Sequence, residues 1–367
     1  MSNSKTVDNE NDLQWAADQA INPRLSQRGR ASFDFLAGLR AAMNTTLTPA
    51  INNDLAVSGV SNDALPDDDH QIAEAMARTD SNALRVSHLC KEWHRNNHGP
   101  LAAEAFFEIQ DAIDPAISAL DQGSSVTLHL NDQQVAPGYW DGVAFHRTTG
   151  GWDAFPLAGF VHGELVHKLM VERIFPGGIF KQRRAAAREA FSDSYDQILE
   201  LGCSTGHYTS ALADVYPDAD ITGVDLSRTG LEHARRVGNA RHAPWQLYQR
   251  PAEETGFEAQ SFDLVTSYIL LHELPADVVR SVFSEAFRVL RPGGDVMMSD
   301  VTRLSELDKI QRWRTIEDAK HGGEPHWHES ASLDLKEVAE TAGFELVESY
   351  GLGGRPYPWI VRGRKPS

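Results

Sequence analysis

The sequence predicts an α/β protein: a doubly wound, largely parallel sheet that ends in an antiparallel hairpin, preceded by a mostly helical region. Three observations predict it. Short runs of strand-forming residues alternate with helical patterns after residue 191, two such runs near the C-terminus have no helix between them, and the first 150 residues are mostly helical in pattern. Alternating strands and helices are typical of a parallel sheet covered by helices on both faces.

We therefore expect three parts. Residues 1–150 form a mostly helical N-terminal region that serves as a lid or in dimerisation, residues 151–190 form connecting helices, and residues 191–367 form the sheet domain. A chain of 367 residues is too long for one ordinary compact core, which agrees with this division.

The composition favours a small-molecule partner. The chain carries 34 basic and 52 acidic residues, a formal net charge of -18, which repels nucleic acid phosphates and anionic membrane surfaces. No segment approaches the roughly 18 continuous apolar residues of a membrane span. We expect no nucleic acid partner and no membrane partner.

The cysteines and the N-terminus indicate a cytoplasmic protein. Cys90 and Cys203 are too few and too far apart for a disulfide framework or a four-cysteine zinc site. Residues 1–4 have neither the basic start nor the apolar stretch of a signal peptide, so we interpret them as a frayed tail.

In the N-terminal region the helical patterns are interrupted at three places. Residues 52–69 are rich in Asn, Asp, Ser, Gly and Pro and predict a surface loop, with Asp69 as the cap of the next helix. An apolar stripe over residues 105–117 predicts a helix that breaks or kinks at Pro115. Alternating apolar residues at 126–130 predict a short strand.

The connecting region contains two predicted helices. A turn at Gly150–Gly151 precedes a helix over residues 161–174, and a second helix follows the stop at residues 176–178. The basic cluster at 181–184 is interpreted as a solvated helix end. His162, Glu164 and His167 resemble a zinc helix motif, but positions five apart lie well off one face of an α-helix, so structural roles are favoured.

The last part of the chain carries the sheet. The predicted strands are residues 197–201, 220–224, 262–267 and 295–299, and the predicted helices between and before them are 208–215, 230–237 and 277–290. Residues 344–350 and 359–364 are two strands without a helix between them, which predicts an antiparallel hairpin at the sheet edge.

The turn after the first strand indicates the kind of ligand. A doubly wound sheet binds its ligand where strands end and helices begin, here at Gly202, Ser204 and Gly206. A dinucleotide fingerprint would need a third glycine where His207 stands. Glu200 would repel a pyrophosphate but attract a cationic amino acid moiety or a sulfonium. The pattern therefore favours S-adenosylmethionine over a nicotinamide dinucleotide.

Asp225 ends the second predicted strand, about 20 residues beyond the glycine turn, as a single β-α-β unit requires. A carboxylate there can accept two hydrogen bonds from ribose hydroxyls. Any adenosine cofactor would use it, so this residue alone does not discriminate between cofactors. A helix cap beside Ser227 is the alternative.

Five ordered motifs give a stronger signal than the turn alone. They are Ile198–Gly206, Gly223–Ser227, Ser261–Val265, Ile269–Leu274 and Val289–Gly294. With them, residues 195–364 resemble the class I S-adenosylmethionine-dependent methyltransferases, in particular the small-molecule, quinone-biosynthesis-like branch (methyltransferase types 11 and 12). The resemblance implies a Rossmann-like fold and in-line methyl transfer.

The resemblance also implies roles for single residues. Cofactor contacts would come from Glu200, Gly202, Ser204 and Gly206 at the methionine portion, Asp225 and Leu226 at the ribose, Ala252 and Glu253 at the adenine edge, and Tyr268 near the methionine end and the substrate. Ser204 replaces the usual middle glycine, a mild change because serine is small. Pro251 stands where the family often has an aspartate, so the adenine contact would pass to Glu253 or to a backbone group.

Methyl transfer to a protic acceptor requires alignment and a base. His272 is the first candidate base because its unperturbed pKa near 6.5 suits proton removal at neutral pH, although a structural role is the alternative. Glu273 would orient it or cap a helix. In the loop 321–329, His328, His326 and Glu324 are further candidates. His326 and His328 could supply two metal ligands, but a solvated loop is favoured and no metal is predicted.

The sequence thus predicts a methyltransferase for a small, apolar or aromatic molecule, possible homodimer formation, and a helical region that covers the pocket. Trp140, Phe145 and Trp152 would form a lid or pack between the parts. The alternatives are an S-adenosylmethionine-binding protein without turnover, methylation coupled to cyclisation of an apolar substrate, and, as the weakest, a nicotinamide enzyme.

Overall fold

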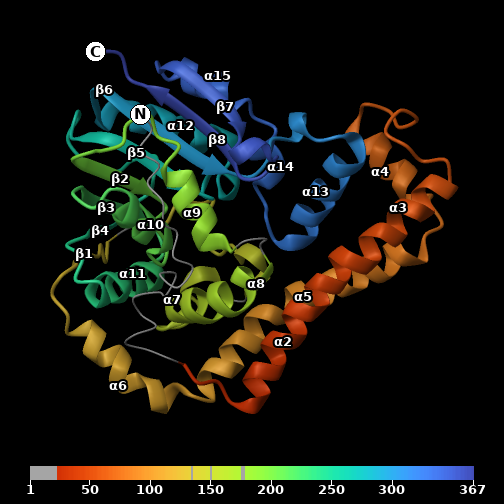
Figure 1. Cartoon of the computed structure of the whole chain (residues 1–367), viewed down its shortest axis with the longest axis horizontal. Helices are drawn as coiled ribbons and strands as arrows, with labels where there is room; N and C mark the ends of the chain where they lie inside the picture. The colour runs from red at the N-terminus through yellow and green to blue at the C-terminus, as the bar shows by residue number, and fades with distance from the viewer. Residues whose placement is uncertain (1–22, 134, 149–150, 175–177) are drawn as a thin grey trace, which may run out of the picture.

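The computed structural model describes residues 23–133, 135–148, 151–174 and 178–367 (Figure 1). The predicted tail at residues 1–4, the turn residue Gly150 and the predicted stop at 176–177 lie outside these ranges. Among the described residues, none of the helices has the length and apolar character needed to cross a membrane.

One eight-stranded sheet organises the molecule, in the order β1-β4-β3-β2-β5-β6-β8-β7. Its strands are β1 (Thr127–His129), β2 (Gln197–Leu201), β3 (Asp220–Asp225), β4 (Gln246–Gln249), β5 (Phe262–Tyr268), β6 (Leu290–Asp300), β7 (Glu345–Gly351) and β8 (Trp359–Arg364). The six from β1 to β6 pair in parallel, whereas β8 is antiparallel to β6 and β7 to β8. This confirms the doubly wound sheet and the C-terminal hairpin.

Two strands depart from the prediction. The sequence pattern missed β4, whose glutamines at both ends hide its apolar Leu247. The short predicted strand at residues 126–130 is β1, and it pairs with β4 at the edge of the sheet rather than with a neighbour in the N-terminal region. The N-terminal part of the chain therefore contributes a strand to the sheet domain.

Helices cover both faces of the sheet. Successive side chains of a strand point to opposite faces, so Leu199 belongs to the core under α12 (Ala276–Val289) and α15 (Leu335–Thr341), and Ile198 to the core under α10 (His207–Val215) and α11 (Arg228–Ala240). Short segments complete this half of the chain: η6 (Leu271–Glu273), η7 (Leu304–Glu306), α13 (Lys309–Gly322), α14 (Trp327–Ala331) and η8 (Leu352–Gly354).

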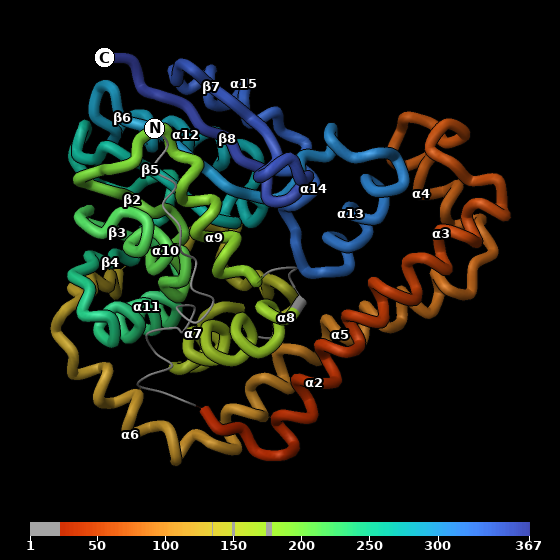
Figure 2. The backbone as a smooth tube through the Cα atoms, in the orientation of Figure 1, coloured from red at the N-terminus to blue at the C-terminus, as the bar shows by residue number. Residues whose placement is uncertain are grey.

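The N-terminal helices form a long bracket beside the sheet, which we call the helical arch (residues 27–121). It comprises α2 (Gln27–Ala42), η2 (Met43–Leu47), α3 (Thr48–Val57), α4 (Asp69–Ala77), α5 (Asn82–Phe107) and α6 (Gln110–Asp121). In Figure 1, α2 and α5 run side by side from the neighbourhood of α6 to a tip made by α3 and α4. Figure 2 shows the same path as a backbone tube, from red through orange.

The arch is attached at both ends. At one end Asn239 of α11 donates to the Leu120 carbonyl at 2.8 Å. At the other, Trp313 of α13 is buried among apolar side chains of α3 and α4, and Lys309 donates to the Leu65 carbonyl at 2.8 Å. The arch therefore spans from one side of the sheet domain to the other.

Three local predictions in the arch need correction. The predicted loop at 52–69 is shorter, since α3 continues to Val57 and α4 begins at Asp69. Asp68 and not Asp69 caps α4, accepting from the Gln71 amide at 2.9 Å. Pro115 lies inside α6, and the break falls between α5 and α6 around Ile109, whose ψ of 0° is not helical.

The connecting region forms one long helical run over residues 158–174, and then α9 (Ile179–Ala187). Before it lie two short turns, η3 (Phe145–Arg147) and η4 (Gly151–Asp153), and the run comprises α7 (Ala158–Phe160), η5 (Val161–Val171) and α8 (Glu172–Ile174). The helix predicted for 161–174 is thus confirmed and begins three residues earlier. The segment η5 is a π-helix, with about one more residue per turn than an α-helix.

The packing of α7 on α11 depends on Gly159. A Cβ there would lie 2.0 Å from the Thr229 carbonyl oxygen. Gly159→Ala must push the two helices apart and should lower the free energy of unfolding by about 1–3 kcal/mol or more. Gly38→Ala is the matched control, because Gly38 lies in α2 with no atom within 4 Å of its added Cβ. There alanine should raise stability by up to about 1 kcal/mol. Urea unfolding of both variants measures this; equal changes would contradict the packing argument.

Candidate functional site

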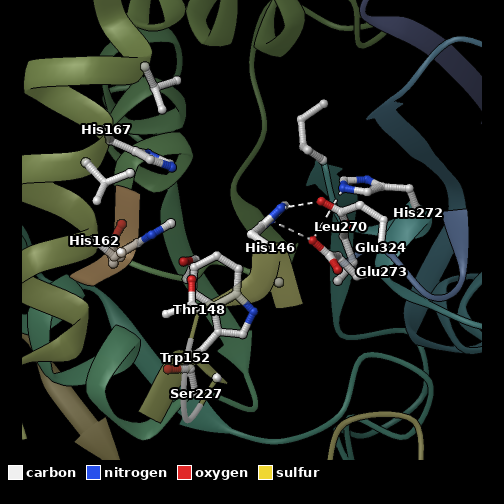
Figure 3. A pocket seen from close by; sticks show the side chains of 18 of the residues that line it. His146, Thr148, Trp152, His162, His167, Ser227, Leu270, His272, Glu273 and Glu324 are labelled. Atoms are coloured by element: carbon white, nitrogen blue, oxygen red, sulfur yellow. Dashed lines mark ion pairs between the residues drawn. The ribbon is translucent and has the colours of Figure 1, made fainter. Parts of the chain in front are cut away.

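A large cavity opens at the carboxyl ends of the central parallel strands. Its volume is about 930 Å³, and its lining is mostly apolar. All three parts of the chain contribute to it: the sheet domain by the strand ends and following loops, the connecting region by η5 and α9, and the arch by residues 94–107 of α5. Figure 3 shows His162 and His167 of η5, His146, and Glu273 and Glu324 around a common space.

The turn after β2 has three residues in the left-handed region: Gly202 at φ 71°, Ser204 at φ 46° and Gly206 at φ 79°. A Cβ on Gly202 would lie 2.8 Å from Leu270 Cδ1, so this glycine is also required by close packing. The sequence predicts that Ser204 is a mild change from glycine because serine is small, but what matters at this position is the left-handed backbone. Its positive φ costs a side-chain-bearing residue about 1–2 kcal/mol, and its amide donates to Asp225 at 2.8 Å.

Glu200 and Arg183 are buried groups of opposite charge that both line the cavity. Among the described residues, Glu200 Oε2 has no hydrogen-bond partner, and neither have Nε and Nη1 of Arg183. Burial raises the pKa of Glu200 to about 8. Buried polar atoms are normally paired, because an unpaired one costs about 1–3 kcal/mol. The two side chains are thus placed to bind a ligand that carries both charges.

The burial of Arg183 corrects the interpretation of the basic cluster. In α9, Lys181 is exposed and Arg184 is half-buried, but Arg183 points inward, with its Nη2 3.2 Å from Nδ1 of His167. Its guanidinium also lies 5.3 Å from the ring centre of Tyr268. The helical periodicity of four adjacent polar residues allows one of them to face the core, and only packing shows which one.

Asp225 ends β3 and is fixed by the backbone. Its two oxygens accept from the amides of Ser204 and Ser227, both at 2.8 Å. Burial raises its pKa to about 6. A carboxylate oxygen can accept a second hydrogen bond, so both oxygens can still accept from a ligand hydroxyl. Leu226, the next residue, lines the cavity.

Of the two residues predicted to contact the adenine, one lines the cavity and the other does not. Ala252 lines the cavity. Glu253 is not among the lining residues; its carboxylate accepts from the Tyr139 hydroxyl at 2.7 and 2.9 Å, and Tyr139 is the residue that faces the cavity. The sequence offered no signal for this, because Tyr139 and Glu253 are far apart in the chain.

Tyr268, at the end of β5, lines the cavity beside Arg183. Its hydroxyl donates to Gln182 Oε1 at 2.5 Å, and burial raises its pKa to about 12. It therefore remains a neutral phenol at neutral pH, able to position a neighbour but not to act as a base.

His272 does not have the ordinary pKa on which its role as a base was predicted. Its Nδ1 lies 3.1 Å from Asp300 and its Nε2 lies 3.4 Å from Glu273. Burial alone would lower its pKa, but the two carboxylates outweigh burial and raise it to about 10. The buried imidazole holds its proton at neutral pH, and Glu273 lies beside it, whereas the N-cap residue of α12 is Pro275.

Of the three candidates predicted in residues 321–329, Glu324 lines the cavity and the two histidines do not. The side chain of His328 is 57% exposed, and its nearest charged partner is Asp69 at 3.9 Å. His326 contacts Glu329 at 3.2 Å. Gly322 and Trp327 line the cavity together with Glu324. His328 is therefore removed from the catalytic candidates.

His146, which the sequence interpretation missed, lies between two acidic residues. Its Nε2 is 3.1 Å from Glu273 Oε1, and its Nδ1 contacts Glu324 (Figure 3). The φ of 52° at His146 is unusual for a residue with a side chain. A histidine close to a double glycine was the available signal, and it is too common to be informative.

The structure also changes the reasoning about His162 and His167. Both line the cavity, and their ring centres are 4.3 Å apart. In an α-helix, positions five apart diverge, but η5 is a π-helix, whose i to i+5 hydrogen bonds place them on one face. Glu164 points away, toward His233 at 3.1 Å. The three residues therefore do not converge as a zinc site.

The left-handed backbone at residue 204 has a measurable consequence. Ser204→Gly removes the steric cost and should raise the free energy of unfolding by about 1 kcal/mol, less what glycine gains in unfolded-state entropy. Ser284→Gly, at an exposed position of α12, is the control and should lower it by about 0.5–1 kcal/mol. Chemical denaturation distinguishes them; a loss at Ser204 equal to that at Ser284 would show that no strain is relieved.

Comparison with known proteins shows which family part of this chain matches. Residues 198–294 match the family described as a methyltransferase domain. The chain is 33% identical over 120 residues to the ubiquinone/menaquinone biosynthesis C-methyltransferase UbiE of Desulfotalea psychrophila, covering 33% of this chain and 47% of that protein. It is 35% identical over 128 residues to the malonyl-(acyl-carrier protein) O-methyltransferase of Legionella pneumophila, covering 35% of this chain and 44% of that protein.

The chain thus spans just under half the length of these two relatives. A solved structure of phosphoethanolamine N-methyltransferase 2 from Haemonchus contortus is similar at 18% identity, with a TM-score of 0.47, over 63% of this chain and 61% of that one. The matched residues 198–294 contain the glycine turn, Asp225 and Tyr268. They form a class I, S-adenosylmethionine-dependent methyltransferase domain.

Proposed function

We propose that the whole chain is a methyltransferase that transfers the methyl group of S-adenosylmethionine to a small, apolar or aromatic acceptor inside the cavity. The observation that carries this proposal is the pair of buried groups Glu200 and Arg183, each of which lines the cavity and keeps polar atoms without a hydrogen-bond partner among the described residues. The amino acid portion of S-adenosylmethionine carries an ammonium and a carboxylate, the two charges that this pair would satisfy.

The remaining lining supports the same arrangement. With its amino acid portion between Glu200 and Arg183, the cofactor would direct its ribose to Asp225, which keeps acceptor capacity on both oxygens. S-adenosylmethionine supplies an electrophilic methyl group, and the protein's part in an in-line displacement is alignment and exclusion of water. Tyr268, beside Arg183, would border the methyl group.

The lining supports an apolar or aromatic acceptor, and the volume leaves room for it. Single ligands occupy sites of about 300–1,000 Å³, and this cavity, at about 930 Å³, is near the upper end. The lining includes several aromatic and apolar side chains: Phe107, Trp140, Trp152, Phe155, Met170 and Leu270. Such a lining favours an apolar or aromatic acceptor.

We further propose that the helical arch closes the site. Residues of α5, among them His94, His98 and Phe107, line the cavity, so without the arch this side would be open to water. Closure suits a reaction that must exclude water from an electrophilic methyl group. Dimer formation stays a prediction.

The first test of the cofactor site uses Arg183→Met with Arg184→Met as control, since Arg184 lies in the same helix but pairs with Asp214 outside the cavity. A hydrogen bond to a charged group contributes about 1.5–3 kcal/mol. Its loss in Arg183→Met should weaken S-adenosylmethionine binding roughly tenfold to a hundredfold. The affinity of Arg184→Met should equal that of the wild type. Calorimetry with decarboxylated S-adenosylmethionine completes the test. If wild type and Arg183→Met discriminate equally against that analogue, Arg183 does not bind the carboxylate.

The second test uses pH. With a pKa of about 8, Glu200 holds a proton in the free protein at pH 7, and binding of a cationic group should release it. Affinity for S-adenosylmethionine should therefore rise from about pH 6.5 to about pH 8, by at most about tenfold per pH unit. Asp225, with a pKa of about 6, contributes mainly below this range. Glu200→Gln should bind more weakly and without this rise; a pH-dependent rise that persists in the variant would assign it to another group.

The third test addresses turnover. The full chain should convert S-adenosylmethionine to S-adenosylhomocysteine with at least one member of a panel of phenols, enols and apolar hydroxy compounds, and mass spectrometry should show a gain of one methyl group. S-adenosylmethionine binding without product across the panel would favour a binding protein. A product with the methyl gain and a new ring would favour coupled cyclisation.

A further inference from the structure

We propose that His146, Glu273 and Glu324 bind a divalent metal ion at the acceptor end of the cavity, and that the ion holds an oxygen of the acceptor. The ligand set is separate from the predicted histidines of the loop 321–329, for which no metal was expected. The role in acceptor binding rests on the proposed methyl transfer, whereas the metal site itself does not.

The first argument is convergence. The three side chains come from three segments far apart in the sequence: η3, η6 and the loop between α13 and α14. One potential ligand atom from each lies within 4.8 Å of the others. Figure 3 shows the carboxylates of Glu273 and Glu324 side by side and facing His146, with both ion pairs drawn. A small inward adjustment would bring all three atoms to the 2.0–2.2 Å that a metal ion of this kind requires.

The second argument is the state of the carboxylates. The side chains of Glu324 and Glu273 are only 8% and 14% exposed. The second oxygen of each, Oε2, is buried and has no hydrogen-bond partner in the part of the chain that the structure describes. Two buried carboxylates around one imidazole repel each other and keep unsatisfied oxygens. A divalent cation would neutralise both carboxylates and use oxygens that are otherwise unpaired.

The third argument is the backbone that presents His146. Both His146 and Arg147 have positive φ, 52° and 55°. Such conformations cost about 1–3 kcal/mol each and are concentrated at functional sites. The His146 amide donates to the Gly323 carbonyl at 3.1 Å, and a Cβ at Gly323 would lie 2.7 Å from the Arg147 amide nitrogen. The segment with His146 and Arg147 therefore fits tightly against Gly323, which holds His146 beside Glu324.

The donor set identifies the class of metal. One imidazole with two carboxylates suits Mn²⁺, Fe²⁺ or Zn²⁺ better than Ca²⁺, which prefers oxygen alone, or Cu⁺, which prefers sulfur. Three protein ligands leave coordination positions open, the usual arrangement of a catalytic metal rather than a structural one. Because all three residues line the cavity, the open positions can face the acceptor.

An acceptor with a hydroxyl group, such as a phenol or an enol, would bind through its oxygen. The metal lowers the pKa of that hydroxyl, whose proton passes to water. The oxygen then forms a bond to the methyl carbon, the bond from that carbon to sulfur breaks, and its electron pair remains on the sulfur of S-adenosylhomocysteine.

The test measures metal binding directly. Full chain treated with a chelator and dialysed should bind about one Mn²⁺ per chain by calorimetry, with a change in the Mn²⁺ paramagnetic resonance spectrum, and Zn²⁺ should compete. Glu324→Gln and Glu273→Gln should each weaken Mn²⁺ binding at least about tenfold, the lower range for losing a metal contact. Glu329→Gln, in the following helix α14 and with a half-exposed side chain, is the matched control and should bind as wild type.

S-adenosylmethionine binding and thermal unfolding of each variant show whether it folds. A wild type that binds neither Mn²⁺ nor Zn²⁺, or Gln variants that bind Mn²⁺ like the control, would overturn the metal site and identify His146 as a purely structural ion-pair partner. S-adenosylmethionine binding without metal binding would leave the proposed function intact. Metal binding without S-adenosylmethionine binding would leave the metal site intact and overturn the proposed function.

Discussion

The parallel pairing of β2 between β3 and β5 is the constraint on which the site depends. It places Glu200 opposite Gly223 and Thr266, so that all three strands end at one edge of the sheet. Only there can a left-handed turn bring the Ser204 amide onto Asp225 while keeping Glu200 inside the protein. The carboxylates that would hold a cationic and hydroxylated ligand therefore have their positions set by the backbone ladder and not by flexible side chains.

The site also requires that the edge of the sheet at which β2, β3 and β5 end is covered. The sheet domain exposes the strand ends, and the helical arch and η5 close over them. The arch is held at α11 by Asn239 and at α13 by Trp313, and its long helix α5 also packs on η5, where Phe106 and Leu165 share one apolar cluster. A long helix held at several points can border a large cavity without filling it. This accounts for a cavity volume near the upper range for a single ligand.

Charge is distributed unevenly inside the cavity. Near the glycine turn, Glu200 and Arg183 have unpaired atoms, and elsewhere in the lining Glu273 and Glu324 face His146. Burying charged groups is costly unless each is paired. The two regions satisfy this condition incompletely with protein atoms alone, and both can be completed by ligands: the amino acid portion of the cofactor on one side and a divalent cation with the acceptor on the other.

The sequence by itself determined what is encoded locally. Strand, glycine turn and helix follow one another within a few residues, Asp225 follows at the distance of one β-α-β unit, and the hairpin strands have no helix between them. The spacing between neighbouring elements of this kind does not depend on how the rest of the chain packs. The tertiary structure alone decided that Arg183 faces inward, that β1 joins the sheet, and that His146 meets Glu273 and Glu324. It also decided that His162 and His167 share a face, because a π-helical hydrogen-bond register replaces the α-helical one. These features depend on contacts between distant segments, and residue spacing carries no information about which of several polar side chains will be enclosed when those segments pack.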